Sequence, residues 1–329
     1  ASGEKLPKTQ SEIVFQGHSV EVRLYAEDPQ VEFLPSIGTL HHLIFGPGLR
    51  VETGVQTGDL VSPFYDPMIA KLIATGPDRA TALQRLLRGL KLTQIAGVKT
   101  NRDFLISLLQ HPEFMVGKFD TGLIGRDLPA MIEVTPPSSQ EWALAALVSM
   151  ELSTLAQELE FQGFSIFTPS RQQVVLLCQD ETKLIHVSLK GVRASVEVDG
   201  TIVSLHFVEQ GWRVVGELQI ATVFAARKVY LFTAEMRVFD CPDPLDHTAS
   251  VKSDGAITAP MPGLVKQVFV SLGQEVAQGD PIVVLEAMKM QHTLRAADVG
   301  QVQQITVTEN MQVDAGQIMA VIVPLSEAN

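Results

Sequence analysis

The last part of the chain repeats itself, and this repeat limits the possible folds more than any other feature of the sequence. When residues 256–324 are shifted by 37 positions, glycines and apolar residues coincide at strand spacing. The coinciding pairs are Gly263/Gly300, Val265/Val302, Val268/Ile305, Val270/Val307, Gly273/Asn310, Val276/Val313, Gly279/Gly316 and Val284/Val321. Gly273 and Asn310 suit a turn with positive φ, which both residue types tolerate. Two copies of a four-strand unit therefore predict a small quasi-twofold β-sandwich.

Lys289 lies between the two copies, in the run Glu-Ala-Met-Lys-Met at residues 286–290. The chain passes here from the first copy to the second, which predicts an exposed hairpin tip. A lysine amine at a tip can form an amide with the carboxylate of a cofactor, and the flanking methionines can adapt to a partner. The alternative is an ordinary solvated lysine. The junction position and the Ala-Pro-Met-Pro-Gly segment at 259–263 favour an attachment site.

The middle of the chain, residues 138–242, predicts a helix followed by many strands. Turn-rich segments at 134–139 and 242–255 separate this block from its neighbours. A helix is expected over 141–159, and its first half, 142–148, is apolar on all sides, so it must be surrounded. Strands are expected at 173–178, 184–189, 193–198, 201–207, 212–216, 220–225 and 228–232, with a hairpin at Asp199-Gly200. This order predicts a β-barrel wrapped around a central helix.

The first block, residues 1–132, mixes strands and helices. Val20, Val22 and Leu24 alternate with Glu21, Arg23 and Tyr25, as in a half-buried strand. Further strands are expected at 39–45 and 68–75. Leucines at 83, 86, 87 and 90 predict an amphipathic helix with Asp78 as its cap, and a second helix should run from 100 or 101 to 109. The whole chain is therefore expected to be multidomain and mainly β, with an α+β first domain.

Composition excludes several classes of protein. The chain has 329 residues and a formal net charge of −12, without the clustered Lys and Arg that nucleic-acid binding needs. Its longest uncharged helical stretch, 142–150, is too short to cross a membrane. The start has no apolar signal core, and it also lacks an initiator Met, which suggests a missing upstream part. Cys178 and Cys241 are too few for a disulfide framework, which indicates a reducing compartment; Cys178 is expected to fill a core.

The last block, with Ala-Met-Lys-Met at 287–290 and the proline-rich segment at 259–263, resembles the biotin carboxyl carrier domain of biotin-dependent carboxylases. Lipoyl domains share that fold, but their lysine is not flanked by two methionines. The resemblance implies covalent biotin on Lys289 and modification by a biotin protein ligase.

The first block resembles the C-terminal domain of biotin carboxylase. The motifs that carry the resemblance lie at residues 17–29, 33–36, 65–72 and 97–101. In that family the arginine of the Glu-x-Arg strand stabilises the negative charge on the enolate of biotin, which implies this role for Arg23. The alternative is a strand arginine paired with Glu21. Asp66 is a second candidate for the same site, with turn capping as its alternative.

The order of the three blocks resembles the α-subunits of acyl-CoA carboxylases, the 3-methylcrotonyl-CoA enzymes most closely and the geranyl-CoA and propionyl-CoA enzymes next. This resemblance implies that the barrel docks a carboxyltransferase β-subunit, and that ATP, Mg and bicarbonate load the biotin in an intact enzyme. No glycine-rich phosphate loop or metal-binding carboxylate set is found in the sequence, and we expect no metal site. We therefore expect the chain to be inactive alone, in the cytoplasm or the mitochondrial matrix. The alternative is a biotinylated carrier without catalysis.

Overall fold

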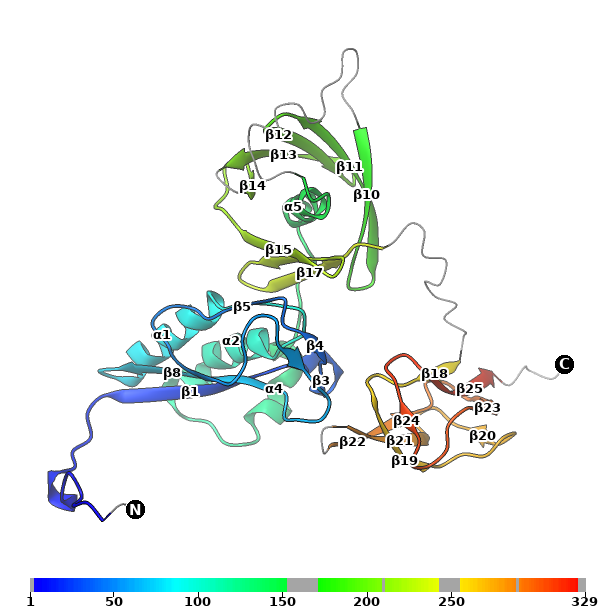
Figure 1. The fold of residues 1–329 in the computed structure, drawn as a ribbon, viewed down its shortest axis with the longest axis horizontal. Helices are drawn as coiled ribbons and strands as arrows, with labels where there is room; N and C mark the ends of the chain where they lie inside the picture. The colour runs from blue at the N-terminus through cyan, green and yellow to red at the C-terminus, as the bar shows by residue number, and fades with distance from the viewer. Residues whose placement is uncertain (1–2, 153–170, 209–210, 243–254, 288–289, 325–329) are drawn as a thin grey trace.

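The computed structural model describes residues 3–152, 171–208, 211–242, 255–287 and 290–324. The described residues form three blocks that follow one another along the chain (Figure 1). Each block has its own hydrophobic core. The mainly β character that the sequence predicts is confirmed.

The first block is built on an antiparallel sheet in the order β1 (His18–Tyr25), β8 (Met68–Gly76), β6 (Arg50–Thr53). Two helices, α1 (Arg79–Lys91) and α2 (Arg102–Gln110), contribute to the core below it. The smaller elements are η1 (Gln10–Glu12), β2 (Glu27–Asp28), η2 (Pro29–Val31), β3 (Leu34–Pro35), β4 (Gly38–Thr39), β5 (His42–Ile44), β7 (Leu60–Val61), β9 (Gln94–Ala96), α3 (Pro112–Val116) and α4 (Leu123–Met131).

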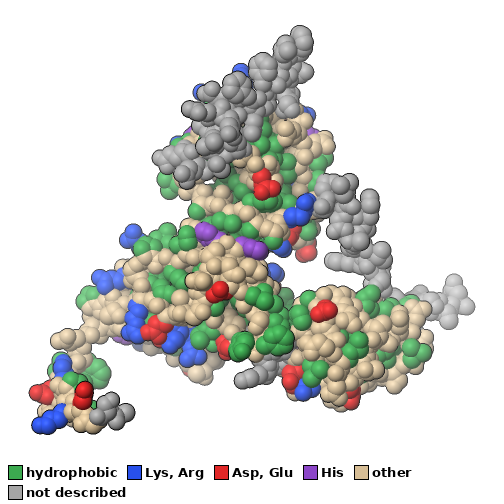
Figure 2. Space-filling view, viewed as in Figure 1, with side chains coloured by type: hydrophobic (Ala, Val, Ile, Leu, Met, Phe, Trp, Pro, Cys, Tyr) green, Lys and Arg blue, Asp and Glu red, His purple; other side chains and the backbone are tan. Residues whose placement is uncertain are grey.

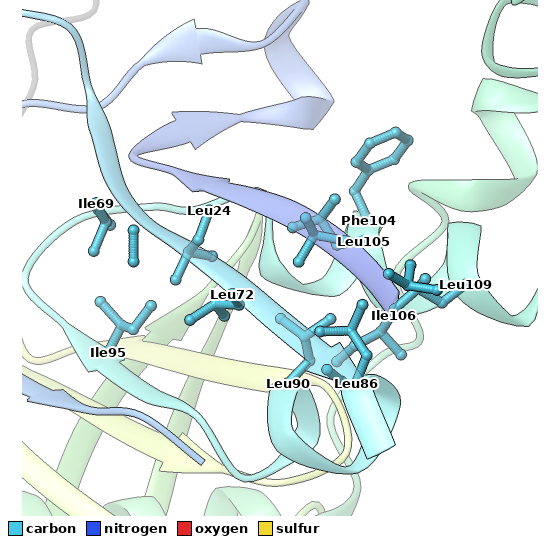
Figure 3. Packing of buried hydrophobic residues seen from close by; sticks show 14 of the residues in the cluster. Leu24, Ile69, Leu72, Leu86, Leu90, Ile95, Phe104, Leu105, Ile106 and Leu109 are labelled. Atoms are coloured by element: carbon cyan, nitrogen blue, oxygen red, sulfur yellow. The ribbon is translucent and has the colours of Figure 1, made fainter. Parts of the chain in front are cut away.

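The core of this block joins one face of the sheet to the helices. Leu24 and Leu72 point toward Leu86 and Leu90 of α1 (Figure 3). Asp78 caps α1 as expected, because its carboxylate accepts a hydrogen bond from the Thr81 amide at 2.8 Å. Burial on one side leaves the polar residues of β1 on the opposite, exposed face.

Two expectations for this block need correction. The run 39–45 is two short strands, since β4 pairs with β7 and β5 pairs with β9. Helix α2 begins at Arg102 and ends at Gln110, whereas the sequence predicted a helix from 100 or 101 to 109. The side chain of Asn101 makes no capping hydrogen bond. It accepts a hydrogen bond from the Tyr25 amide at 2.9 Å and donates one to the Arg23 carbonyl at 3.2 Å, so it fixes the end of β1.

The second block is an eight-stranded antiparallel sheet that curls around helix α5 (Ser139–Ser149) (Figure 1). The strands follow the order β14-β13-β12-β11-β10-β17-β16-β15, so β14 and β15 are the edges and, among the described residues, the barrel is open. Their bounds are β10 (Arg171–Cys178), β11 (Glu181–Lys190), β12 (Arg193–Val198), β13 (Thr201–Val208), β14 (Gly211–Val214), β15 (Ala221–Ala225), β16 (Lys228–Phe232) and β17 (Met236–Asp240).

Helix α5 is buried on every side, as its apolar sequence predicts. Residues 142–147 are all buried, and the indole of Trp142 packs edge-on against Phe239 at 4.8 Å. The helix ends at Ser149, whereas the sequence predicted residue 159. Glu151 follows with φ of 48°, which ends the helical path, and residues 153–159 lie outside the described part.

The strands of this block confirm one prediction from the sequence and add one strand that the sequence did not predict. The hairpin at Asp199-Gly200 is confirmed, since both residues have positive φ and Val198 pairs with Thr201. Strand β17 was not expected, and it joins β10 to β16 in the middle of the sheet.

The third block confirms the repeat. Each strand of the first copy has a counterpart 37 residues later: β19 (Gly263–Val268) with β23 (Gly300–Ile305), β20 (Glu275–Val276) with β24 (Gln312–Val313), and β21 (Pro281–Ala287) with β25 (Ile318–Pro324). The fourth pair is β18 (Ala256–Thr258) and β22 (Met290–Arg295). The two sheets run β18-β25-β23-β20 and β22-β21-β19-β24, so each contains strands of both copies.

The turn residues of the repeat behave as the sequence predicts. Gly273 has φ of 81° and Asn310 has φ of 64°. The Gly273 amide donates to the Val302 carbonyl at 2.8 Å, and the Asn310 amide donates to the Val265 carbonyl at 2.7 Å. Each copy therefore ties its turn to a strand of the other copy.

We predict that Asn310→Ala lowers the free energy of unfolding by about 1 kcal/mol, because alanine is strained at this φ. Asn310→Gly should change it by less than about 0.5 kcal/mol, since glycine accepts positive φ without strain. Hydrogen exchange of amides in residues 255–324 measures both effects. Equal losses of protection in the two variants would contradict the role of the turn conformation.

Candidate functional site

The expected attachment site lies at the end of the β21–β22 hairpin. Lys289 itself lies outside the described residues. The two strands are paired from Pro281/Arg295 up to Ala287/Met290, which leaves residues 288 and 289 as the connection between them. The lysine that the sequence predicts to be modified is therefore one of the two residues that connect β21 to β22.

The strands beneath this connection are held by a close backbone approach. Gly263 of β19 lies against β21, where a Cβ at position 263 would be 2.9 Å from the Glu286 carbonyl oxygen. The equivalent Gly300 lies in the same way against Val323, 37 residues after Glu286. Lys266 pairs with the Glu286 carboxylate at 3.2 Å. Glycine is therefore needed at positions 263 and 300, because a side chain there would clash with the backbone of the neighbouring strand. The sequence alone did not reveal this reason.

Arg23 lies on the exposed face of the β1–β8–β6 sheet. It is opposite Lys71 in the register of β1 and β8, and Lys71 is opposite Glu52 of β6. Within the described part of the chain, the Arg23 guanidinium has no hydrogen-bond or ion-pair partner. The expected alternative, a pair with Glu21, is not formed there.

Three residues missed by sequence reasoning lie on the same face. Arg50 and Lys71 both form ion pairs with Glu52, the Lys71 pair at 3.1 Å. Hydrogen bonds from Arg50 and then from Lys71 lower the pKa of Glu52. Arg50 keeps 74% of its side chain exposed, so the face presents two accessible guanidinium groups, those of Arg50 and Arg23. The sequence did carry a signal for this face, since Arg50 and Glu52 alternate with Val51 as on the exposed side of a strand.

Asp66 lies at the same end of the sheet as Arg23, because Tyr25 of β1 pairs with Met68 of β8. Its carboxylate accepts a hydrogen bond from the Met68 amide at 2.9 Å, which is the turn-capping contact considered as its alternative role. Burial, and then the charge of Asp66, raise the pKa of Glu27. Glu27 and Asp66 are therefore close enough to interact.

Neither cysteine has reactive surroundings. Burial raises the pKa of the Cys178 and Cys241 thiols to about 11 in each case, and Cys178 packs in the core around α5 as expected. Among the described residues there is no group of three or more His, Cys, Asp or Glu that could hold a metal ion. The helices in this part of the chain are all too short or too polar to cross a bilayer.

Two families match parts of the chain. The family described as "Biotin carboxylase C-terminal domain" matches residues 21–126, and the family "Biotin-requiring enzyme" matches residues 255–322. The α-subunit of mitochondrial methylcrotonoyl-CoA carboxylase from Rattus norvegicus is 33% identical over 95% of this chain and 48% of its own length. The chain therefore contains a biotin carboxylase C-terminal domain and a domain of the biotin-requiring family, and it is homologous to part of the α-subunits of acyl-CoA carboxylases.

Two other relatives have a similar sequence identity to this chain. The Dictyostelium discoideum methylcrotonoyl-CoA carboxylase α-subunit is 30% identical over 98% of this chain and 51% of its own length. The α chain of mitochondrial propionyl-CoA carboxylase from Rattus norvegicus is 30% identical over 97% of this chain and 47% of its own length. The chain thus spans about half the length of these carboxylase subunits.

Two solved structures are also similar to this chain. The biotin carboxylase domain of Hydrogenobacter thermophilus 2-oxoglutarate carboxylase is 38% identical, with a TM-score of 0.39, over 41% of this chain and 30% of that chain. A single-chain, multi-domain long-chain acyl-CoA carboxylase is 22% identical, with a TM-score of 0.34, over 94% of this chain and 21% of that chain.

The interaction between Glu27 and Asp66 can be tested by titration. Asp66→Asn should lower the pKa of Glu27 because one negative charge is removed. The pKa should stay above its ordinary value, since burial is the larger cause. NMR titration of the Glu27 carboxyl group measures the shift, with Asp59→Asn as the control. An unchanged Glu27 titration in Asp66→Asn would show that the two carboxylates do not interact.

Proposed function

We propose that this chain is the biotin-bearing portion of an acyl-CoA carboxylase α-subunit, with biotin attached to Lys289. The observation that carries the proposal is the β21–β22 hairpin, whose strands pair up to Ala287/Met290 and leave only residues 288 and 289 between them. The match of residues 255–322 to the biotin-requiring family supports the same residue. A biotin protein ligase is the expected modifying partner.

The chemistry at Lys289 suits this cofactor. Its primary amine can form an amide with the valerate carboxylate of biotin, and the bound group then supplies a ureido nitrogen that accepts and releases a carboxyl group. The described strands β21 and β22 would present the lysine at the end of a paired ladder. In the intact enzyme, ATP, Mg and bicarbonate would serve the loading step. The Hydrogenobacter thermophilus relative was solved with MgADP, ADP and bicarbonate.

Arg23 is the proposed stabiliser of negative charge on the ureido group, and Asp66 is a weaker candidate for lining the same site. Support for Arg23 comes from its exposed position on the sheet and from the absence of a described partner for its guanidinium. An unpaired, oriented cation is the arrangement that electrostatic stabilisation needs. Arg50, on the same face, is a competing candidate because its side chain is 74% exposed, but its guanidinium is already paired with Glu52.

The curled sheet around α5 is the proposed docking surface for a carboxyltransferase β-subunit. Val175 and Leu184 face each other across β10 and β11 with 43% and 52% exposure, which places apolar side chains on the outer surface. Exposed apolar side chains that lie next to each other are more favourably covered by a protein partner than by water.

The acyl group is best assigned by similarity. We propose 3-methylcrotonyl-CoA, because the Rattus norvegicus relative for that substrate is 33% identical, against 30% for the propionyl-CoA relative. A geranyl-CoA enzyme is a further possibility. These named relatives are mitochondrial, so the proposed location is the mitochondrial matrix in a eukaryote and the cytoplasm in a bacterium.

The attachment residue is tested by co-expression with a biotin ligase. The wild-type chain should give a streptavidin-reactive band, and Lys289→Arg should lose it because arginine cannot form the amide. Lys266→Arg is the matched control, since Lys266 is a described lysine of the same domain. A band that persists in Lys289→Arg would contradict the proposal.

The role of Arg23 is tested in the intact α-subunit by bicarbonate- and biotin-dependent ATP cleavage. Arg23→Met should lower kcat by about 10²–10³-fold, the usual loss when a charge-stabilising group is removed. Arg50→Met is compared under the same conditions. A large loss in Arg50→Met alone would overturn the assignment to Arg23 and move the role across the sheet to β6.

A further inference from the structure

Two apolar side chains of the first block pack against the core of the third block. Leu34 of β3 and Ile37 after it pack against the hydrophobic cluster of residues 259–322, and neither belongs to the described core of its own block. The biotinyl domain lies beside the end of the first block that carries β3 and β4 (Figure 1). Hydrophobic side chains of the two blocks meet along this border (Figure 2).

The segment that presents these side chains is held in a strained conformation. Glu32 and Phe33 have φ of 49° and 58°, which is costly for residues other than glycine. Phe33 is anchored by an edge-on contact with Phe104 of α2, with ring centroids 5.1 Å apart. The strained turn directs Phe33 into its own core and leaves Leu34 and Ile37 at the surface.

Polar contacts fix the rest of the segment. The Lys99 ammonium pairs with the Asp28 carboxylate at 2.5 Å, and the Lys99 amide donates to the Ser36 hydroxyl at 2.9 Å. Asp28 also accepts a hydrogen bond from the Gln30 amide at 3.1 Å. Residues 27–37 therefore form a rigid, preorganised platform, in which Phe33 packs into the core of its own block and Leu34 and Ile37 pack against the carrier.

This platform adjoins the candidate site. The amide of Ala26, directly before it, donates to the carbonyl of Pro67, directly after Asp66, at 2.9 Å. Glu27, its first residue, interacts with Asp66. Arg23 lies a few residues upstream on β1.

We propose that residues 27–37 are a docking platform for the biotinyl domain of this same chain, and that it holds the carrier next to the site of Arg23 and Asp66. This inference rests on the proposed function, because it gives the carrier a place to dock for loading. Among the described residues, two apolar side chains of the first block pack against the carrier core, far fewer than the roughly 20–30 residues a side of a stable interface. The carrier can therefore leave the platform, as a carrier that serves two sites must do.

Small-angle X-ray scattering of the full chain tests the platform. Leu34→Asp combined with Ile37→Asp should increase the radius of gyration and the maximum dimension, because two charges would be placed against the carrier core. Val31→Asp is the matched control: Val31 is exposed on the same segment and does not belong to the carrier contact, so its scattering should equal that of the wild type.

Two further readouts separate the possible failures. Hydrogen exchange should show faster exchange in residues 255–324 at the contact in the double variant, with β1 and α1 unchanged, which excludes unfolding of the first block. Streptavidin reactivity should persist, because attachment of biotin does not depend on the platform. Scattering identical to that of the wild type in a folded double variant would overturn the docking proposal while leaving the function of Lys289 intact.

Discussion

The structure of the biotinyl domain depends on backbone hydrogen bonds exchanged between the two copies of its repeat. The amide of Gly279 donates to the carbonyl of Ala296, and the amide of Gly316 donates to the carbonyl of Ala259, the same contact 37 residues apart. Each sheet contains strands from both copies, so neither copy satisfies its backbone groups alone. The β21–β22 hairpin is formed where one copy passes to the other. In the sequence, Lys289 directly precedes β22 and therefore falls at the junction of the two copies.

The proposed attachment residue occurs in one copy of the repeat and not in the other. The position 37 residues after Lys289 is Ser326, which has no amine. In each copy a glycine admits a close backbone, Gly263 against Glu286 and Gly300 against Val323. The described strands are thus duplicated, whereas the proposed attachment lysine has no equivalent in the second copy.

Sequence periodicity predicted those features that depend on local patterns. The alternation in β1, the Asp78 cap and the buried helix α5 all follow from residue spacing. Strand β17 was not predicted, because its register is fixed by pairing with β10 and β16, which lie far from each other in sequence. The same holds at the candidate site: Lys71 faces Arg23 only because β1 pairs with β8, and β6 adds Arg50 and Glu52 to that face. The end of α5 was missed because the positive φ of Glu151 has no signature in the sequence.

The proposed function joins a carrier lysine, an exposed arginine face and an apolar platform in one chain. The most direct test of biotin attachment at Lys289 is peptide mapping by mass spectrometry of the chain co-expressed with a biotin ligase. We expect one biotin per chain, found only on the peptide that contains Lys289. Biotin on any other lysine, or no biotin in the presence of an active ligase, would contradict the proposed attachment.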